Sequence, residues 1–526
     1  MGSGGGRRWV AVAVAAAIAG TGAGAARAAS PPVGPAGDGF YAPPPAMLPG
    51  PVGRVVWQRP TTGIPALRAA ARTTTVLYRS RSGTGAPIAS SGTVAVPPGT
   101  PPRGGWPIVS WFHVTTGAGD RCAPSRATAD NPELERLTRG DVIASRLLAA
   151  GVAVARVDGE GIGTPGPHPY LVGPSLMRSQ VDLVRAAREL DPAIGSRWVA
   201  AGHSEGGVAT LFSAAQARRY APELDLRGAA AFAPLVDAVD LIGLFRLIPL
   251  PLAPVGAGTL AALGGLIAAG AAEDDPRIAA ALRTGLLGPR ATALLGHLES
   301  RCLTELGRAD SWGGLAPSEV PGPRFDELWP VAREVLERHN VRRLSFGDLP
   351  IRVDVGVADA ITNIALAERF AAEQRARGTR LTYERWPSAT HETITSDAQA
   401  ARAGVRWIVD RLGPGEAAED QPPPAASSPA APRCVPATSG PAAGRVRLVA
   451  GRRHAVLRLR SRTDRRLRIA AERPADARGR PRTRSTTRRA SACRTLRLRL
   501  PRDVRRVRIS AHGLRPVTVR PAGRLR

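Results

Sequence analysis

The 526-residue chain lacks the motifs that would point to a metal ion or a nucleotide. Its eight histidines are scattered, and its four cysteines have none of the spacings of a zinc site. Residues 159–166 are rich in glycine, but the segment has no phosphate-loop lysine and no helix start after it. We therefore predict no cofactor and no metal ion. The segment is interpreted as a structural loop, and His168 and Tyr170, which follow it closely, are expected to have packing or turn roles.

The most informative motif is Gly-His-Ser-Glu-Gly at residues 202–206. It follows an apolar run at 198–201 that is typical of a buried strand, and it precedes a run at 208–212 that is typical of a helix. Glycines on both sides of a serine allow a sharp, strained turn that exposes the hydroxyl group. A plain glycine-rich loop is the alternative for so short a motif. The flanking elements favour a nucleophile elbow, with Ser204 as the nucleophile.

A serine hydroxyl is a weak nucleophile unless a base removes its proton. Among the histidines that follow Ser204, His391 fits best, because it comes after a strand-like run at 381–386 and a short turn. His297 and His339 lie in charged, helical sequence, where surface positions are expected. We therefore predict His391 as the general base.

The base needs a carboxylate that orients it. Asp359 stands at the C-terminal end of a predicted strand at 351–358, and sheets of α/β proteins carry their chemistry at that end. Asp354, inside the same strand, is the alternative. In the predicted mechanism Asp359 accepts the Nδ1 hydrogen of His391, Nε2 takes the proton of Ser204, and water cleaves the resulting acyl-enzyme.

The tetrahedral intermediate of such a reaction needs two hydrogen-bond donors. One is the backbone N–H of Glu205, which follows the nucleophile. The other usually comes from a loop after an earlier strand, and the strand-like residues 107–112 lead into such a loop at 113–117. We predict Thr116 as the second donor and keep Thr115, and an ordinary strand-to-helix turn, as alternatives.

Three segments together carry a resemblance to a known family. Residues 113–117 followed by Cys-Ala-Pro-Ser at 122–125 are similar to a G-T-T-G oxyanion loop that leads into C-A-P-S. Residues 158–170 are similar to a D-Y-x-G-L-G-T-P-G segment, and the elbow is the third. This combination resembles the secretory lipases of fungi and actinobacteria, which include the Candida lipase A type. The similarity extends from about Pro60 to Leu412. It implies an α/β-hydrolase fold, a helical lid, and hydrolysis of carboxylesters or triacylglycerols.

Two residues depart from the pattern of that family. Val114 follows His113 where a His-Gly pair is common, which bears on the geometry of the oxyanion hole. Thr390 precedes His391 where glycine is usual, which is expected to tighten the histidine loop. Neither departure removes a predicted catalytic residue.

A long segment separates the strand-like residues 229–233 from the next predicted strand, and it is far longer than one crossover helix needs. We predict a helical lid over about residues 235–345 that covers Ser204 with an apolar roof. Buried structural helices, or a membrane span over 247–272, are the alternatives. Prolines between 249 and 254 interrupt the apolar run and favour short helices.

Residues 1–28 resemble a signal peptide. Two arginines precede an apolar run at 9–19, and Ala-Arg-Ala at 26–28 fits a cleavage site. We predict a secreted protein, with a retained anchor as the alternative and a weak indication of twin-arginine export. The predicted α/β-hydrolase domain then covers residues 29–412.

The four cysteines fit an oxidising compartment, where an even number allows full pairing. Three pairings are possible, and we favour Cys122 with Cys302 and Cys434 with Cys493. The first would join the predicted oxyanion-side loop to the lid, and the second would close the C-terminal region.

The positive charge is concentrated at the C-terminus. Residues 434–526 contain 28 arginines and four acidic residues, a formal charge of +24, which leaves +5 of the total +29 for the rest. Residues 413–433 are rich in proline and alanine and are interpreted as a linker. Beyond the linker, apolar residues and arginine alternate with period two in short segments between 445 and 509. This pattern predicts a small all-β, sandwich-like domain with an arginine-covered face.

An arginine-rich face is most simply a solvated surface. The alternative is that the tail binds anionic polymers or lipid head groups of a cell envelope and holds the protein near its substrate. Specific nucleic-acid binding is not predicted, because aromatic residues make up only 4% of the chain and none form a stacking platform in the tail strands.

The predicted fold class is therefore α/β: an α/β-hydrolase core with a helical lid insertion and a small C-terminal all-β domain. The predicted function is a secreted serine carboxylester hydrolase, a lipase or esterase acting on acyl esters or lipids as a monomer. A serine peptidase or acyltransferase on the same fold is one alternative. An envelope-binding protein, with the arginine-rich tail as the functional module, is another. The sequence does not fix the acyl length.

Overall fold

The computed structural model describes residues 1–2, 30–248 and 258–413 and, beyond them, the backbone of strands between residues 445 and 519. The chain divides into two units, Met1–Glu419 and Asp420–Arg526. Almost all of the predicted signal peptide and of the predicted linker lies outside the described residues. So does the predicted pair Cys434 and Cys493.

A nine-stranded sheet forms the centre of the first unit, in the order β1-β2-β3-β5-β4-β6-β7-β8-β9. Its strands are β1 (Val55–Pro60), β2 (Arg72–Arg81), β3 (Pro87–Val96), β4 (Trp106–Phe112), β5 (Ala153–Val157), β6 (Ile194–His203), β7 (Asp225–Phe232), β8 (Ile351–Gly356) and β9 (Leu381–Trp386). Pairs from β1 to β5 are antiparallel, and pairs from β5–β4 to β8–β9 are parallel. The parallel strands therefore present their carboxyl ends at one edge.

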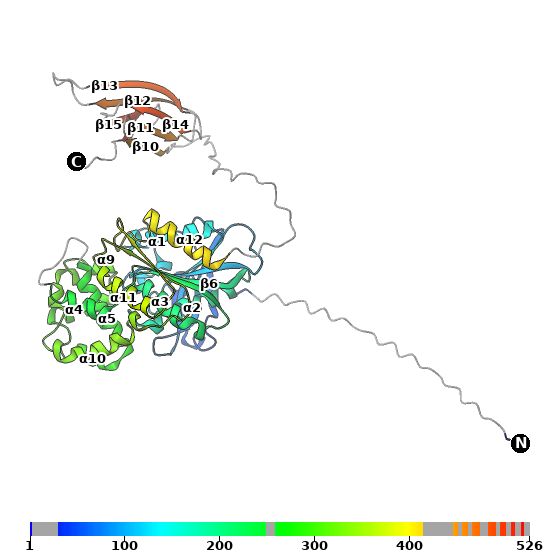
Figure 1. Ribbon diagram of the computed structural model, residues 1–526, viewed down its shortest axis with the longest axis vertical. Helices are drawn as coiled ribbons and strands as arrows, with labels where there is room; N and C mark the ends of the chain where they lie inside the picture. Colours follow the sequence, from blue (N-terminus) through cyan, green and yellow to red (C-terminus); the bar gives the residue numbers. More distant parts are fainter. Residues whose placement is uncertain are drawn as a thin grey trace. The chain divides into compact units, whose positions relative to one another are not determined.

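Both faces of this sheet are covered by helices, because apolar residues alternate between two cores. In β4, Ile108 and Phe112 belong to one core, whereas Val109 and Trp111 belong to the other. The first core is shared with α2 (Gly173–Leu190), α3 (Glu205–Tyr220) and α11 (Ile364–Ala376). The second is shared with α1 (Leu134–Ala149) and α12 (Ala398–Leu412). Figure 1 shows α1 and α12 on one side of β6, with α2 and α3 on the other.

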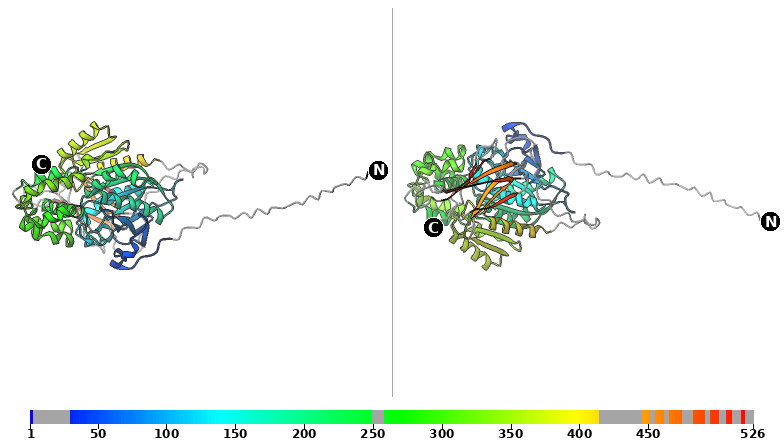
Figure 2. Two further views of the ribbon diagram at one scale, coloured as in Figure 1. Left: turned by 90° about the horizontal axis from the view of Figure 1, so that it is seen from below. Right: turned by 90° about the horizontal axis from the view of Figure 1, so that it is seen from above.

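The long segment between β7 and β8 is helical in its described part. It contains α4 (Ala238–Phe245), α5 (Gly258–Asp274), α6 (Pro276–Arg283), α7 (Pro289–Ala293), α8 (Leu295–Ser300), α9 (Leu303–Leu306) and α10 (Phe325–Arg338). In Figures 1 and 2 these green helices gather at one end of the sheet. We call residues 235–345 the insertion. Among the residues that are described, no helix has the length and apolar character needed to cross a membrane.

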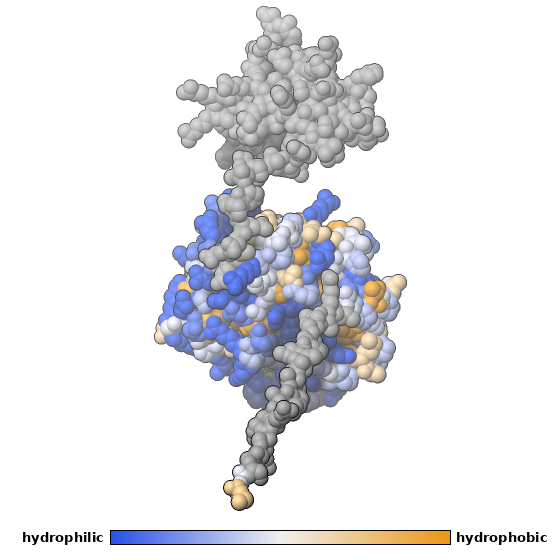
Figure 3. Space-filling view, turned by 90° about the vertical axis from the view of Figure 1, so that its right-hand side faces the viewer, coloured by the Kyte–Doolittle hydropathy of each residue, from blue (hydrophilic) through white to orange (hydrophobic). Residues whose placement is uncertain are grey.

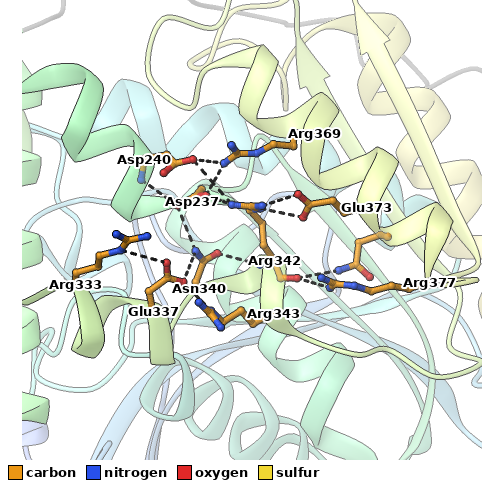
Figure 4. A network of polar contacts seen from close by, with 11 residues as sticks. Asp237, Asp240, Arg333, Glu337, Asn340, Arg342, Arg343, Arg369, Glu373 and Arg377 are labelled. Carbon is orange, nitrogen blue, oxygen red and sulfur yellow. Dashed lines mark hydrogen bonds and ion pairs between the residues drawn. The ribbon is translucent and has the colours of Figure 1, made fainter. Parts of the chain in front are cut away.

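A cluster of charged residues around the buried Asp237 joins the two ends of the insertion to α11, and we call it the clamp (Figure 4). Asp237, at the start of the insertion, caps α4 by accepting the N–H of Asp240 at 3.0 Å. Its carboxylate also accepts from Arg342 at 2.5 Å, at the end of the insertion, and from Arg369 of α11 at 2.9 Å. Arg342 in turn donates to Glu373 of α11 at 3.0 Å. The insertion is thus closed at its base.

The surface of the first unit is mainly hydrophilic on the face shown in Figure 3, where apolar residues form small groups. Among the described residues, few large apolar side chains are exposed, and two of them, Leu244 and Leu247, lie in the insertion at 46% and 71% exposure.

The second unit contains two antiparallel sheets. One has the order β10-β11-β14 and the other β13-β12-β15-β16. The strands are β10 (Arg445–Ala450), β11 (Ala455–Arg460), β12 (Arg465–Arg473), β13 (Arg482–Ala490), β14 (Thr495–Leu500), β15 (Arg506–Ser510) and β16 (Val517–Val519). Five of these strands lie where the sequence pattern indicated them. The alternation of apolar residues and arginine did not predict β13 and β16, because β13 has hardly any apolar residues and β16 is very short.

Candidate active site

Ser204 sits at a strained turn between β6 and α3, as the elbow motif predicts. Its φ of 58° and ψ of −112° are rare for a residue with a side chain. The turn requires glycine at position 202, because a Cβ atom there would lie 2.3 Å from the carbonyl oxygen of Gly206. A Cβ atom on Gly206 would lie 2.1 Å from the carbonyl oxygen of Phe112. Only glycine fits at these two positions.

The three residues predicted to form a triad meet at the carboxyl edge of the sheet. His391 Nε2 lies 2.9 Å from Ser204 Oγ, and His391 Nδ1 lies 2.9 Å from Asp359 Oδ2. All three side chains are almost fully buried. Nδ1 donates to the carboxylate, so Nε2 is free to accept the serine hydrogen. This geometry allows proton transfer from the hydroxyl group to the imidazole.

Asp359 is held by its own loop. It accepts hydrogen bonds from the Ile361 N–H at 2.8 Å, the Thr362 N–H at 2.9 Å and the Thr362 hydroxyl at 2.8 Å. Burial opposes the charged form, but His391 and these donors outweigh it and hold the pKa of Asp359 well below its usual range. The carboxylate is therefore ionised and fixed against the imidazole.

Asp354, the alternative acid, is not placed to orient His391. It is fully buried inside β8, where both of its oxygens accept from Arg352 at 2.7 Å and one also accepts from Trp386 Nε1 at 2.7 Å. Burial raises the pKa of Asp354 in spite of these donors. Its oxygens are already used, so the alternative is wrong.

The loop that carries His391 is fixed from several sides. His203 Nε2 donates to the His391 carbonyl oxygen at 2.9 Å. Burial and the neighbouring His391 lower the pKa of His203 well below 6.5. Thr390, which replaces the usual glycine, exchanges hydrogen bonds with Thr393, its N–H donating to the Thr393 hydroxyl at 2.9 Å. Glu392 forms an ion pair with Arg139 of α1 at 2.9 Å.

The predicted oxyanion loop packs directly against the insertion. The Leu303 N–H donates to the Thr116 carbonyl oxygen at 2.9 Å, and Gly117 forms a backbone bridge with Cys302. A disulfide bond joins Cys122 to Cys302, as predicted, with Cα atoms 5.5 Å apart. The loop after β4 and the segment before α9 therefore form one covalently closed unit.

The two candidate donors of this loop differ in their side chains. The Thr115 hydroxyl forms a hydrogen bond of 3.0 Å with the hydroxyl of Tyr170. The Thr116 hydroxyl is buried without a hydrogen-bond partner in the described structure. His113 is buried beside them, and its Nε2 lies 2.8 Å from the Asp158 carbonyl oxygen. His113 thus fastens the loop to the glycine-rich segment.

An apolar pocket opens at Ser204. Its empty space is about 1000 Å³, the open mouth included. The lining comes mostly from the insertion and comprises, among others, Leu241, Ile242, Leu260, Leu263, Ile267, Ile278, Leu287, Phe325, Trp329 and Leu336. Arg246 is the charged residue among those that line it. The pocket can hold a long apolar group next to Ser204.

His168 was predicted to have a packing or turn role, but the structure shows that it contacts the carboxylate of Glu205. His168 Nε2 lies 2.7 Å from Glu205 Oε1, and both side chains are fully buried. No local motif predicts this pair, because the residues are 37 positions apart. His297 and His339 were predicted to lie at the surface, and this prediction was incomplete. Both are half-buried and bonded, His297 to Ser311 and His339 to Asp274, each at 2.9 Å.

Among the described residues, no group of histidine, cysteine and acidic side chains is arranged to hold a metal ion. A mixed sheet flanked by helices, with a strained serine after its central strand, defines the α/β-hydrolase class. The sequence family described as "Secretory lipase" matches residues 137–420. The chain belongs to this secretory lipase family.

Two curated relatives are similar to parts of the chain. A probable inactive lipase of Mycobacterium tuberculosis is 28% identical over 358 residues, which cover 64% of this chain and 73% of that protein. Lipase A of Arthroderma benhamiae is 32% identical over 216 residues, which cover 38% of this chain and 44% of that protein.

Solved structures share the fold at low sequence identity. Candida antarctica lipase A in its closed state is 20% identical, with a TM-score of 0.55, and the match covers 69% of this chain and 86% of that one. The rice cell wall degrading esterase LipA of Xanthomonas oryzae is 19% identical, with a TM-score of 0.53, and the match covers 69% of this chain and 99% of that one. These likenesses establish the α/β-hydrolase fold.

Proposed function

We propose that the protein is a secreted serine carboxylester hydrolase, a lipase or esterase that acts through an acyl-enzyme. The observation that carries the proposal is the bridge that His391 makes between Ser204 and Asp359 at the mouth of an apolar pocket. Membership of the secretory lipase family supports an ester substrate and export. We include in the proposal a signal peptide that is cleaved after residue 28.

In the proposed reaction Ser204 Oγ attacks the ester carbonyl carbon while His391 Nε2 takes the hydroxyl proton. The oxyanion that forms is stabilised by the N–H groups of Glu205 and Thr116. The carbon–oxygen bond to the alcohol then breaks, and the alcohol leaves with the proton from His391. Water then attacks the acyl-enzyme and gives a proton to His391, and His391 returns this proton to Ser204 Oγ as the bond between the acyl group and Ser204 breaks and the acid leaves. Asp359 stabilises the imidazolium in both halves of the cycle.

The proposed role of the insertion is that of a lid. Its helices supply most of the apolar lining of the pocket, so an acyl chain would be bound away from water. Each buried methylene group stabilises the complex by about 0.8 kcal/mol. An apolar pocket of this kind favours an acyl ester over a peptide substrate, which argues against the peptidase alternative.

One relative is described as a probable inactive lipase, so catalytic competence has to be tested directly. The test is turnover of p-nitrophenyl esters from acetyl to stearoyl by the purified protein. We expect hydrolysis with a preference for chains that fill the pocket. Ser204→Ala should lower kcat by about 10⁴-fold or more, because it removes the nucleophile.

The matched control is Ser300→Ala, at an exposed position at the end of α8. This variant should hydrolyse the same esters as the wild-type protein. Equal turnover by the wild type and Ser204→Ala, or no turnover of any ester, would refute the proposed function.

For the C-terminal unit we propose a role in binding anionic lipid head groups at the cell envelope. The strand register places Arg447, Arg458 and Arg497 opposite one another in β10, β11 and β14, and the residues that alternate with them are mostly apolar. Like charges at paired positions are unfavourable unless an anion balances them. Residues 413–433 would be the linker and 434–526 the binding domain.

Binding to vesicles with and without anionic lipid tests this role. The full chain should bind anionic vesicles and lose binding as salt is raised, because ions screen exposed charges. Removal of residues 434–526 should abolish binding and leave ester turnover in solution intact. Unchanged binding after this deletion would refute the role of the tail.

A further inference from the structure

A second buried imidazole–carboxylate pair lies beside the proposed nucleophile and takes no part in the triad. It consists of His168, which lies between the glycine-rich segment and α2, and Glu205, the first residue of α3. His168 Nε2 and Glu205 Oε1 are 2.7 Å apart, and neither side chain has exposed surface. Neither residue lines the apolar pocket. A buried pair next to Ser204 is therefore not explained by substrate binding.

With Glu205 ionised, the partners of the ring require its charged form. His168 Nδ1 lies 2.8 Å from the Glu160 carbonyl oxygen, which can only accept a hydrogen bond. Nε2 faces an oxygen of the Glu205 carboxylate, which also accepts when ionised. Both ring nitrogens must then carry hydrogen, which is the imidazolium form. The second carboxylate oxygen, Glu205 Oε2, is buried and has no hydrogen-bond partner in the described structure. His168 is thus the cation that balances Glu205.

Few other charges face this pair. The Glu160 carboxylate is held by the Ser175 hydroxyl and by the Gly83 N–H at 3.0 Å. The ring of Tyr170 lies 6.0 Å from the ring of His168. Arg178 of α2 favours the charged form of Glu160, and Arg136 of α1 favours the charged form of Tyr170, both through electrostatic attraction.

The electrostatic surroundings agree with the hydrogen bonds. Burial alone would lower the pKa of His168, but the Glu205 carboxylate and the Glu160 carbonyl outweigh burial and raise the pKa above 6.5. A raised pKa means that the pair stabilises the fold fully below about pH 6.5 and that this stabilisation is lost as pH rises through the raised value.

The backbone N–H of Glu205 is the donor that faces the developing oxyanion in the proposed reaction. A carboxylate on the same residue would oppose that negative charge if it were not balanced, and the interaction is strong where water is excluded. We propose that His168 is a positioning residue, which neutralises Glu205 and fixes the first turn of α3 so that its N–H can stabilise the oxyanion. This inference rests on the proposed ester hydrolysis.

The test compares kcat and KM of four variants: His168→Gln, Glu205→Gln, the double variant, and the control His339→Gln. His168→Gln should lower kcat about 10²-fold with little change in KM, because an unbalanced carboxylate weakens only the transition state. Adding Glu205→Gln to it should restore kcat at least about tenfold, since the unbalanced charge is gone. The control alters a similar pair, His339 with Asp274 at 2.9 Å in the insertion, and should leave kcat unchanged.

The pH profile gives a second measurement that a packing role would not move. Activity of the wild type should fall at alkaline pH as His168 loses its proton, and Glu205→Gln should remove this fall. A double variant no faster than His168→Gln would refute the inference. If His168→Gln does not fold, an unchanged alkaline fall in Glu205→Gln refutes it equally.

The same experiment separates this inference from the proposed function. Labelling of Ser204 by a fluorophosphonate and turnover by the wild type test the proposed function alone. If the wild type is labelled and active but His168→Gln has wild-type kcat, only the role of His168 is wrong. If the wild type is neither labelled nor active, the proposed function is wrong.

Discussion

The site and the clamp are two polar clusters built around buried aspartates that follow neighbouring strands. Asp359, after β8, faces an imidazole at 2.9 Å, whereas Asp237, after β7, faces the guanidinium groups of Arg342 and Arg369. An imidazole can gain and lose a proton near neutral pH, but a guanidinium group stays charged. The first cluster can therefore move a proton, and the second can only hold chain segments together. Burial of a carboxylate is common to both, so the partner decides the role.

The largest effect is expected when the charge of Asp359 is removed. We expect Asp359→Asn to lower kcat by about 10³- to 10⁴-fold, because the amide no longer stabilises the imidazolium or selects its tautomer. Steady-state turnover of a p-nitrophenyl ester measures the effect. Asp237→Asn should retain the kcat of the wild type per folded molecule. A similar loss of kcat in both variants would contradict the difference in role.

The clamp should instead determine stability. We expect Asp237→Ala to lower the free energy of unfolding by about 3 kcal/mol, at the low end for a broken buried ion pair because Arg342 and Arg369 are partly exposed. Urea unfolding followed by tryptophan fluorescence measures this change. The control Asp348→Ala removes an exposed ion pair with Arg218 and should give no measurable change. Equal stability of both variants would show that the clamp does not hold the insertion.

The disulfide bond combines both roles, because it joins the insertion to the proposed oxyanion loop. Replacing Cys122 and Cys302 together by serine should lower the free energy of unfolding by about 2–4 kcal/mol. It should also lower kcat, because the backbone bridge between Gly117 and Cys302 loses its covalent support. Unfolding and turnover with and without reductant measure the two effects, and unchanged kcat would show that the loop is fixed by its hydrogen bonds alone.

The smallest effect is expected at His203, which holds the loop of His391 without touching the substrate pocket. His203→Leu removes the donor to the His391 carbonyl oxygen and should lower kcat by about tenfold, the equivalent of about 1.4 kcal/mol. His203→Gln keeps an N–H donor near the Nε2 position and should recover most of that loss. Turnover measurements that find glutamine as harmful as leucine would assign His203 a packing role.

The sequence was sufficient for the parts of the site that depend on local pattern. The elbow is defined by adjacent residues, and the end of β8 can be located from its apolar run, which put Asp359 rather than Asp354 beside His391. The two aspartates differ in their position along the chain, because Asp354 lies within β8 and Asp359 lies in the loop after it. The family match over residues 137–420 includes the elbow, Asp359 and His391.

Contacts between segments that are distant in the sequence could not be predicted from local sequence patterns. His168 was expected to have only a packing or turn role, since nothing near it in the sequence indicates the carboxylate of Glu205. The clamp was missed for the same reason, because Asp237 and Arg342 are 105 residues apart. The long-range contact Cys122–Cys302 could be predicted because four cysteines allow only three pairings.

The contact of Leu303 with Thr116 has a consequence for engineering by segment exchange. If residues 235–345 were replaced by the same segment of a homologue, Cys302 would be replaced too. Cys302 is both the backbone bridge partner of Gly117 and the disulfide partner of Cys122. Such a chimaera changes the support of the proposed oxyanion loop together with the apolar pocket. Substrate preference and turnover would therefore vary together in a series of these chimaeras, unless residues 301–304 are kept from the recipient.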